Sequence, residues 1–242
     1  MGDSIGVSGQ AVSKWENGSA LPDIQVLPKL ADYFGISIDE LMGYKLNALT
    51  YKEQFVKFML GNGILQIGEF DLKGGQKKNY YLNSEKFTTN AQIAKIGEYF
   101  ADCIRENGIQ YDVIVGLAYH GIAFSTATSC SLFQKYGVTT DFCFDRKVSD
   151  SRGRKICGHT LIDGEKIIIV DDLITTGKTL CERIDRLKEQ ADIDVVAVIV
   201  IANLVNEEAR EKGLGENMLE ERYGTKVYSI ITDKDINDYL NS

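Results

Sequence analysis

The sequence predicts an α/β fold in which helices flank a central parallel sheet. The main observation is a set of largely apolar, β-branched runs at residues 111–116, 167–170 and 195–202. Such runs are typical of strands that are buried on both faces, as in parallel sheets. A second observation is that residues 122–136 and 180–190, which follow the first two strands, have the composition of helices. Strands that alternate with helices favour a parallel sheet.

Composition places the chain among ordinary globular proteins. It has 242 residues, of which 44% are hydrophobic and 26% charged, which is enough for one or two domains with a sizeable core. We find no secretory signal and no apolar run near the roughly 20 residues of a membrane span. The net charge of −8 argues against broad affinity for nucleic acids. Scattered cysteines without metal-ligand spacing predict reduced thiols and a cytoplasmic location; they are residues 103, 130, 143, 157 and 181.

The first 43 residues are expected to form a separate, all-α segment. Within it, residues 8–18 resemble the recognition helix of the Cro/C1-type (XRE) helix-turn-helix family. In that family such a helix lies in the major groove of DNA. On this resemblance, Gln10, Ser13 and Lys14 would face base edges or phosphates.

Two further helices are expected in this segment. Residues 21–34 have the pattern of an amphipathic helix that Pro28 kinks or restarts, and residues 37–40 form a capping box for a last short helix. Family members carry further helices before the position of Ile5, so we expect a truncated helix-turn-helix segment over residues 1–43. The segment holds six acidic residues and two lysines, a net charge of −4, so we predict that the chain does not bind DNA on its own.

A linker and a β-hairpin follow. Residues 44–50 are predicted to be the linker, so that the chain divides into segments 1–43, 44–50 and 51–242. A helix is expected next, and then two strands that a lysine-rich turn joins. These elements are the helix 51–62, the strand 64–72, the turn 73–78 and the strand 80–83. Later elements are helices at residues 91–107 and 207–222 and strands at residues 140–144 and 225–233.

The chain is organised around residues 165–180, where a buried strand, an acidic pair, a small-residue loop and a helix follow one another. The loop amides and the helix N-terminus attract a phosphate. The carboxylates of Asp171 and Asp172 can accept hydrogen bonds from vicinal sugar hydroxyls. Gly177 lets the backbone approach a ligand closely. The order of these parts predicts a site for a phosphorylated sugar.

This stretch has two other interpretations. In the first, the two aspartates only cap the element that follows the strand. In the second, Gly177, Lys178 and Thr179 end a P-loop of an ATPase. That motif requires glycine five residues before Gly177, and the position holds Asp172. The P-loop interpretation is therefore excluded.

The stretch closely resembles the loop that binds phosphoribosyl pyrophosphate (PRPP) in type I phosphoribosyltransferases. Residues 51–240 resemble orotate phosphoribosyltransferase in several ordered motifs. The resemblance implies the type I phosphoribosyltransferase fold with a small hood hairpin. It also implies Mg²⁺ that arrives bound to PRPP, with no residue as a direct metal ligand. The PRPP-binding residues that it implies in the loop are Asp171, Asp172, Leu173, Ile174, Thr175, Thr176, Gly177, Lys178 and Thr179.

The same resemblance extends to the hood hairpin and to the loop after the strand 111–116. Lys73 would touch PRPP, while Tyr81, Leu82 and Thr175 would contact the flat base. Tyr119 and His120 lie in the loop that receives pyrophosphate in the family. His120 occupies the position of a family lysine, and a histidine is mostly neutral at pH 7.

Residues 145–155 resemble the mobile loop that closes over PRPP. Arg146 and Lys147 match it directly, and Lys147 would reach the active site of a partner subunit, which implies a homodimer with shared sites. We therefore assign catalytic and PRPP-binding roles to Arg146 and Lys147, and a catalytic role to the two aspartates. Beyond Lys147 the match fails. The positions of the family's lysine, histidine and glutamate hold Asp150, Arg152 and Arg154.

A second departure concerns the base. The family presents an arginine that pairs with the orotate carboxylate, but residues 203–206 are Asn-Leu-Val-Asn and the next arginine is Arg210. The resemblance implies an enzyme that transfers the 5-phosphoribosyl group from PRPP to orotate, another pyrimidine or a related base and releases pyrophosphate. The alternative is a transcriptional regulator that senses PRPP or a nucleotide through a catalytically weakened domain of this fold.

Overall fold

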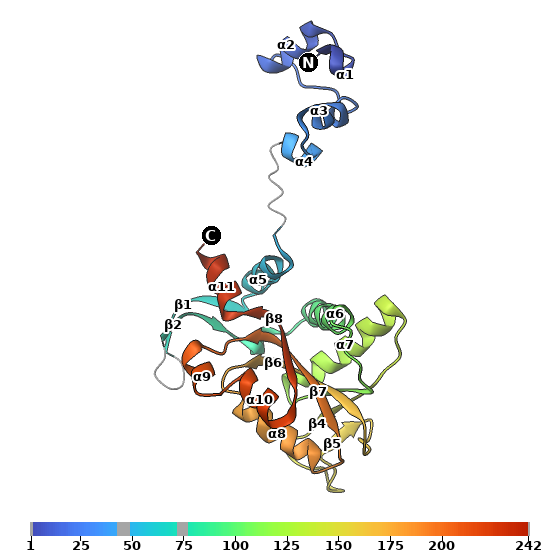
Figure 1. Ribbon diagram of the computed structural model, residues 1–242, viewed down its shortest axis with the longest axis vertical. Coiled ribbons are helices and arrows are strands. Elements are labelled where there is room, and N and C mark those ends of the chain that lie inside the picture. Colours follow the sequence, from blue (N-terminus) through green and yellow to red (C-terminus); the bar gives the residue numbers. More distant parts are fainter. Residues whose placement is uncertain (1, 43–48, 72–76, 242) are drawn as a thin grey trace. The chain divides into compact units, whose positions relative to one another are not determined.

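The computed structural model describes residues 2–42, 49–71 and 77–241. It divides into two compact units, residues 1–50 and 51–242, which are described separately (Figure 1). Most of the predicted linker 44–50 lies outside the described residues, as does Lys73.

The N-terminal unit is a set of short helices. Ser8 caps the second of them, and its hydroxyl accepts a hydrogen bond from the amide of Ala11 at 3.3 Å. A small core forms where these helices meet, from the side chains of Ile5, Val12, Leu30 and Ala31. The helices are α1 (Gly2–Ile5), α2 (Gly9–Glu16), α3 (Leu27–Phe34) and α4 (Ile38–Leu41).

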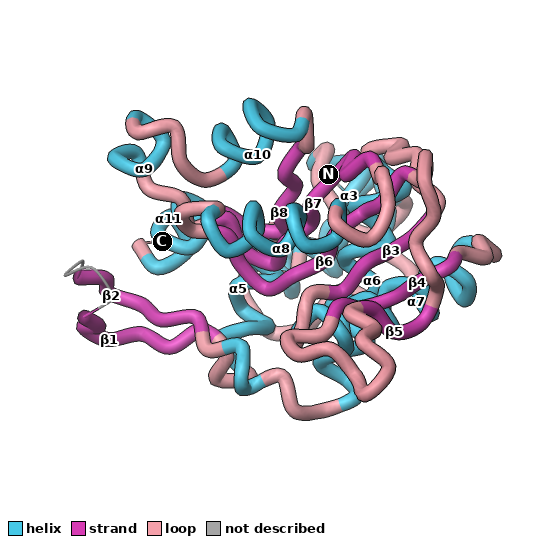
Figure 2. Tube along the Cα trace, turned by 90° about the horizontal axis from the view of Figure 1, so that it is seen from below, coloured by secondary structure: helices cyan, strands magenta, loops and turns pink. Residues whose placement is uncertain are grey.

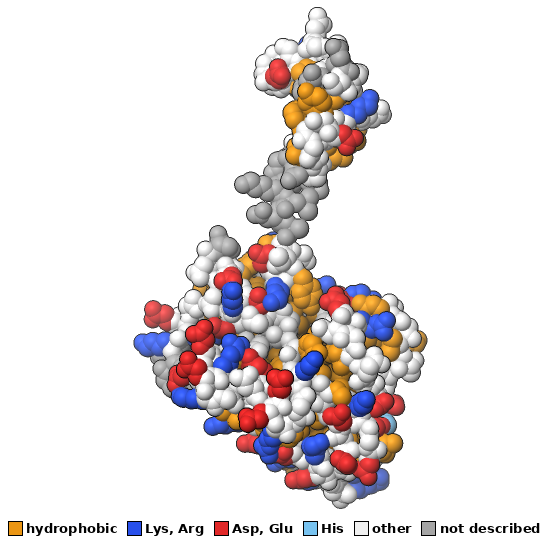
Figure 3. Space-filling view, in the orientation of Figure 1, with side chains coloured by type: hydrophobic (Ala, Val, Ile, Leu, Met, Phe, Trp, Pro, Cys, Tyr) orange, Lys and Arg blue, Asp and Glu red, His pale blue; other side chains and the backbone are white. Residues whose placement is uncertain are grey.

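The predicted helix 21–34 is shorter than its apolar pattern suggested. Helix α3 begins only at Leu27, so Pro28 lies in its first turn and neither kinks nor restarts it. A proline is tolerated there because the amide that it lacks has no partner within the helix. Some hydrophobic side chains of this unit remain exposed, among them Leu21, Ile24, Phe34 and Met42. Figure 3 shows hydrophobic side chains on the visible face of this unit.

The second unit is built on a six-stranded sheet with the order β5-β4-β3-β6-β7-β8. All neighbouring strands are parallel except β4 and β5. The predicted α/β fold with a central parallel sheet is confirmed, and the short antiparallel edge strand β5 was not expected. The strands are β3 (Val113–Gly116), β4 (Asp141–Asp145), β5 (Ile156–Gly158), β6 (Lys166–Ile174), β7 (Asp194–Asn203) and β8 (Lys226–Thr232).

Both faces of the sheet are covered, as the apolar strands require. In β6, Ile168 and Val170 pack with residues of α5, α6 and α7, while Ile167 and Ile169 pack with residues of α8 and α10. Figure 2 shows α8 on one side of the sheet and α6 and α7 on the other. These helices are α5 (Tyr51–Gly61), α6 (Asn90–Glu106), α7 (His120–Tyr136), α8 (Lys178–Lys188) and α10 (Glu216–Tyr223). No helix in the described part of the chain is both long and apolar enough to cross a membrane.

Two predicted elements differ in extent from those in the structure. Strand β6 continues through the two aspartates to Ile174, so the acidic pair lies inside the strand and not after its end. The predicted helix 207–222 is two helices, α9 (Glu207–Glu211) and α10, because Gly213 and Gly215 adopt positive φ angles between them.

The hood hairpin consists of β1 (Leu65–Asp71) and β2 (Lys77–Leu82), which are antiparallel. It is tied to the C-terminal helix α11 (Asp233–Leu240), since the side chains of Lys78 and Tyr80 both donate to the Asp233 carboxylate. Tyr80 is buried, with only 2% of its surface exposed. The base of the hairpin is therefore part of the main core.

Candidate active site

The two carboxylates of β6 face the start of helix α7. His120 is the first residue of that helix, and its Nδ1 lies 3.3 Å from the Asp172 carboxylate. Its Nε2 lies 3.6 Å from the carboxylate of Glu85, on the short helix after the hood. His120 therefore bridges two acidic groups that are 87 residues apart in sequence, a contact that no local sequence pattern indicates.

These neighbours shift the protonation of the site. Burial and the charge of Asp172 raise the pKa of Asp171 to about 8. Burial also acts to raise the pKa of Asp172, but the hydrogen bond from His120 outweighs it and the net pKa is lowered. The same hydrogen bond raises the pKa of His120. His120 is thus a better cation than an unperturbed histidine, at the position where the related lysine is expected.

The loop after β6 forms a phosphate-sized cradle. A pocket of about 190 Å³ is lined by Asp171–Gly177, Thr179 and Leu180. Gly177 has φ +75°, and a Cβ there would lie 2.8 Å from the carbonyl oxygen of Gly215. The amide of Gly215 donates to the carbonyl oxygen of Thr176 at 2.9 Å, and this hydrogen bond ties the loop to the segment before α10. Because α8 begins at Lys178, the cradle lies at the N-terminus of an eleven-residue helix, where an anion is favoured.

The loop after β3 and the start of the predicted mobile loop meet at an aromatic ring. Tyr119 is 66% exposed, and the Lys147 ammonium lies 4.3 Å from the centre of its ring. Tyr119 follows a cis peptide bond after Ala118. A pocket of about 460 Å³ brings together Tyr119, His120, Lys147 and the two aspartates. The structure therefore places Lys147 within the site of its own chain.

Residues 145–155 form a closed turn in this structure. The Asp150 carboxylate accepts hydrogen bonds at 2.9 Å from the amides of Arg152 and Arg154 and from the Arg154 Nε. Lys155 pairs with Glu189 of α8 at 2.9 Å. Both Arg154 and Lys155 therefore have acidic partners inside the chain. Arg146 is half-buried, and its amide donates to the Lys155 oxygen at 2.8 Å, which closes the base of the turn.

The residues expected to contact the base lie on different faces of the hood. Tyr81 is 40% exposed and its ring lies 5.5 Å from that of Phe70, whereas Leu82 is only 5% exposed and packs in the core. This is the alternation of a strand, and it leaves only the Tyr81 side chain open to a base. The amide of Leu204 donates to the Ile174 oxygen at 2.9 Å, so residue 204 lies beside the end of β6.

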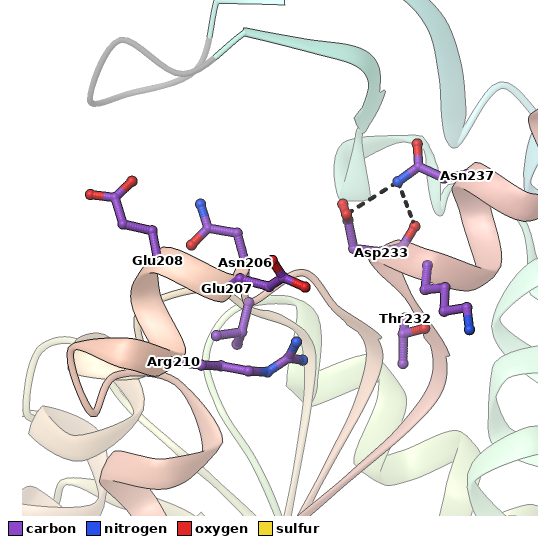
Figure 4. A pocket seen from close by; sticks show the side chains of 9 residues that line it. Asn206, Glu207, Glu208, Arg210, Thr232, Asp233 and Asn237 are labelled. Atoms are coloured by element: carbon purple, nitrogen blue, oxygen red, sulfur yellow. Dashed lines mark hydrogen bonds between the residues drawn. The ribbon is translucent and has the colours of Figure 1, made fainter.

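A separate pocket of about 760 Å³ lies between α9 and α11. Figure 4 shows Arg210 on one side of it and Asp233 and Asn237 on the other, with Asn237 donating to Asp233. Arg210 pairs with Glu216 at 2.7 Å. The next arginine after residues 203–206 is therefore already held by a carboxylate.

Sequence reasoning missed two buried charges beside the site. Asp145 ends β4 and Arg183 lies on α8, and their side chains are 8% and 9% exposed. A sequence signal was present for the second, because Arg183 falls among Leu180, Ile184 and Leu187 on the apolar face of its helix. A charge at such a position indicates a buried partner.

Comparison with known proteins agrees with this arrangement. A family model for the phosphoribosyl transferase domain matches residues 84–222, and a helix-turn-helix model matches residues 1–41. The chain is 36% identical over 198 residues to an orotate phosphoribosyltransferase from Clostridium botulinum, covering 79% of this chain and 86% of that protein. A relative of the same name from Mannheimia succiniciproducens is 35% identical over 200 residues, covering 80% of this chain and 89% of that protein.

A solved structure gives the same result. The crystal structure of orotate phosphoribosyltransferase from Francisella tularensis superimposes with a TM-score of 0.67 at 28% identity, covering 77% of this chain and 86% of that chain. The sheet order, the acidic pair and the loop that precedes α8 thus occur in a chain that resembles these proteins over most of its length. This chain belongs to the orotate phosphoribosyltransferase family, with a helix-turn-helix segment ahead of its phosphoribosyl transferase domain.

Proposed function

We propose that this chain binds PRPP at the site around Asp171 and transfers its 5-phosphoribosyl group to a nucleobase, with release of pyrophosphate. The observation that carries the proposal is the acidic pair beside the amide cradle at the start of α8. The 5-phosphate would lie in the cradle of residues 175–179. The ribose hydroxyls would donate to the carboxylates of Asp171 and Asp172.

The remaining groups of the site suit the departing pyrophosphate. As the bond at C1 of the ribose breaks, positive charge develops on the sugar and negative charge on the leaving group. Lys147 and His120 line one pocket with Asp171 and supply positive charge there. Arg146 would support the loop that presents Lys147. Transfer needs no covalent nucleophile, since positioning and charge stabilisation suffice for a reaction of this kind.

We propose that Mg²⁺ reaches the site bound to PRPP, beside the carboxylates of Asp171 and Asp172. Mg²⁺ commonly keeps several waters and takes its other ligands from substrate phosphates and one or two carboxylates. When bound, it would neutralise charge on the pyrophosphate.

Calorimetry should therefore show PRPP binding that requires Mg²⁺ and is lost on adding excess chelator. Equal PRPP affinity with and without Mg²⁺ would contradict this assignment.

PRPP affinity should fall as the pH rises from 7 to 9. The pKa of His120 is raised above its ordinary value, so its positive charge is present below pH 6.5 and is lost as the pH passes the raised pKa. A charge-assisted contact of this kind is worth about 1.5–3 kcal/mol, or roughly a tenfold or greater change in affinity. The His120→Lys variant should keep its charge and show a flatter profile.

The control for this prediction is the second histidine of the chain, His159, which pairs with Glu165 away from the site. The His159→Gln variant should retain the wild-type pH profile. An unchanged slope in His120→Lys would show that another group, such as Asp171, sets the pH dependence.

We also propose a homodimer with shared sites, on the basis of the Arg146 and Lys147 match to the family loop. Lys147 lies over Tyr119 of its own chain in the structure, and a move to a partner's site would require the turn of residues 145–155 to rearrange. Mixing inactive Lys147→Ala subunits with inactive Asp171→Asn/Asp172→Asn subunits should restore part of the activity through hybrid sites. No recovery after verified subunit exchange would contradict sharing.

The second candidate function is a regulator that senses PRPP or a nucleotide. It is favoured by the helix-turn-helix match and by helix α2, where Gln10, Ser13 and Lys14 are exposed as a DNA-reading surface requires. The net charge of −4 in residues 1–43 opposes DNA binding by this chain alone. We therefore propose that the chain does not bind DNA on its own. Salt-sensitive, sequence-dependent DNA binding that responds to PRPP would favour the regulator.

The domain assignment is likewise a proposal: a helix-turn-helix segment over residues 1–43, a linker over 44–50 and a phosphoribosyltransferase domain over 51–242. We further propose a cytoplasmic location, in keeping with five free cysteines.

A further inference from the structure

A buried ion pair lies directly behind the loop that we assign to pyrophosphate. The Arg183 Nε lies 3.0 Å from one oxygen of the Asp145 carboxylate, and the Arg183 Nη2 donates to the other at 3.2 Å. Both side chains are less than 10% exposed. The pair joins the end of β4 to helix α8, two elements on either side of the loop after β3.

The pair holds both polar groups of one residue in that loop. The amide of Ala118 donates to the Asp145 carboxylate at 2.6 Å, and the carbonyl oxygen of Ala118 accepts from Arg183 at 2.9 Å. The peptide groups on both sides of Ala118 are thus fixed by side chains from other elements. These two hydrogen bonds also position Tyr119 and His120, which directly follow Ala118 in the chain.

The pair also connects the other parts of the site. Asp145 immediately precedes Arg146 and Lys147, and Lys147 lies over the ring of Tyr119. Arg183 is on the helix that begins at the phosphate cradle. A pocket of about 520 Å³ has Ala118, Lys147, Asp171 and Arg183 in its wall. The Asp145–Arg183 ion pair is therefore linked to the loop after β3, to Lys147 and to the phosphate cradle.

Stability alone does not account for such a pair. Removing two charges from water opposes much of their mutual attraction, and apolar residues of similar volume are often as stable. A bidentate arginine contact, however, fixes geometry in a way that apolar packing does not. Arg183 lies on the apolar face of α8, where leucine or isoleucine would fill the space.

We propose that Asp145 and Arg183 are positioning residues that hold the loop Leu117–Tyr119 in the conformation that binds pyrophosphate. The inference rests on the proposed function and adds to it two residues that do not themselves touch substrate. It distinguishes two parts of PRPP recognition. The pair governs the pyrophosphate half of the site, whereas the cradle of residues 175–179 governs the ribose 5-phosphate half.

The experiment compares two probes in the presence of Mg²⁺: inorganic pyrophosphate and ribose 5-phosphate. In the Arg183→Met variant, pyrophosphate affinity should fall at least tenfold, while ribose 5-phosphate affinity should stay within twofold of wild type. Arg183→Lys should recover part of the pyrophosphate affinity, because its ammonium can still pair with Asp145. The double variant Asp145→Asn/Arg183→Met leaves no unpaired charge in the interior, and it should show the same selective loss if the single variant folds poorly.

The matched control is Arg222→Met. Arg222 pairs with Asp185 on the same helix, at 2.8 Å, but the two side chains are 52% and 42% exposed. This variant should bind both probes as the wild type does. An equal loss of both probes in Arg183→Met and in the double variant would show a merely structural pair and overturn the proposal, as would unchanged pyrophosphate affinity.

A ligand-free measurement separates this inference from the proposed function. Hydrogen exchange followed by mass spectrometry should show faster exchange in the peptide that contains residues 117–120 in Arg183→Met and in the double variant, and not in Arg222→Met. If the wild type binds neither probe, the proposed function fails and the exchange result alone decides the positioning role. Unchanged exchange at residues 117–120 would overturn that role.

Discussion

The double variant Asp171→Asn/Asp172→Asn is expected to lose PRPP binding while it keeps its fold. A charged contact from Asp172, at about 1.5–3 kcal/mol, and a neutral one from Asp171, at about 0.5–1.5 kcal/mol, together correspond to a loss of affinity of roughly one to three orders of magnitude. The amides have nearly the same shape as the carboxylates, so packing against β7 is preserved. Calorimetry with Mg²⁺ and PRPP measures the loss, and a melting curve verifies the fold.

The single variants should differ in a defined way. Asp172 is the carboxylate with the lowered pKa and the contact to His120, so Asp172→Asn should cause the larger loss at neutral pH. The pKa of Asp171 is raised to about 8, so an amide there resembles the protonated side chain and should be tolerated better. Asp238→Asn on the exposed face of α11 is the control. Native PRPP affinity in the double variant would remove the acidic pair from the site.

Protonation of Asp171 also predicts a change in stability. Its folded-state pKa lies above the unfolded value, so the folded state binds the proton more tightly and loses stability as the pH rises through about 8. The Asp171→Asn variant removes this group. Its melting temperature should therefore depend less on pH between 6 and 9 than that of the wild type.

The second large effect concerns the base. Turnover with orotate should be weak, because residues 203–206 hold no arginine in the region where the family presents one for the orotate carboxylate. The nearest later arginine, Arg210, pairs with Glu216 at 2.7 Å and faces another pocket. The missing charge-assisted contact is worth about 1.5–3 kcal/mol, or roughly a ten- to hundredfold loss in kcat/KM. A base without a carboxylate, such as uracil or a purine, would not suffer this loss.

Replacing Leu204 should reverse the preference. Steady-state kinetics of Leu204→Arg should show a higher kcat/KM for orotate and no gain for uracil. The control Ile162→Arg places the same charge at an exposed position away from the site and should change neither value. A wild-type orotate rate near that of ordinary family members would contradict the prediction and indicate that a rearranged Arg210 or another group replaces the contact.

The loop beyond Lys147 adds a second reason for slow turnover. Arg154 and Lys155 could supply charge to pyrophosphate only after leaving Asp150 and Glu189. A single electrostatic contact in a transition state is typically worth about 3 kcal/mol, or roughly a hundredfold in rate. This loss in rate should affect turnover with orotate and turnover with other bases alike.

The sequence was sufficient for those parts of the site that are local. The run Ile167–Val170 predicted a buried strand. The acidic pair and the loop at Gly177 follow that run in the order that a phosphosugar site requires. The departure at His120 was also visible. The raised pKa of His120 could not be predicted, because it depends on Asp172. The parallel pairing of β3 and β6 brings Asp172 close to His120.

Other features depend on long-range contacts and could not be derived. Asp145 gave no sign that it would accept the amide of Ala118, 27 residues earlier. The apolar pattern of residues 21–34 predicted a helix that is too long. Leu21 and Ile24 are exposed, and residues 24–26 form a turn ahead of helix α3. For Leu82, the prediction followed the family motif and not strand alternation, which places its side chain in the core.

The most direct test of the central claim is release of pyrophosphate from PRPP by the wild-type chain, with Mg²⁺, in the presence of orotate, uracil or a purine base. We expect release that depends on a base, that disappears in Asp171→Asn/Asp172→Asn, and that is faster with a base lacking a carboxylate than with orotate. Tight binding of PRPP without pyrophosphate release for any base would contradict a transferase and leave the PRPP-sensing regulator as the function of this fold.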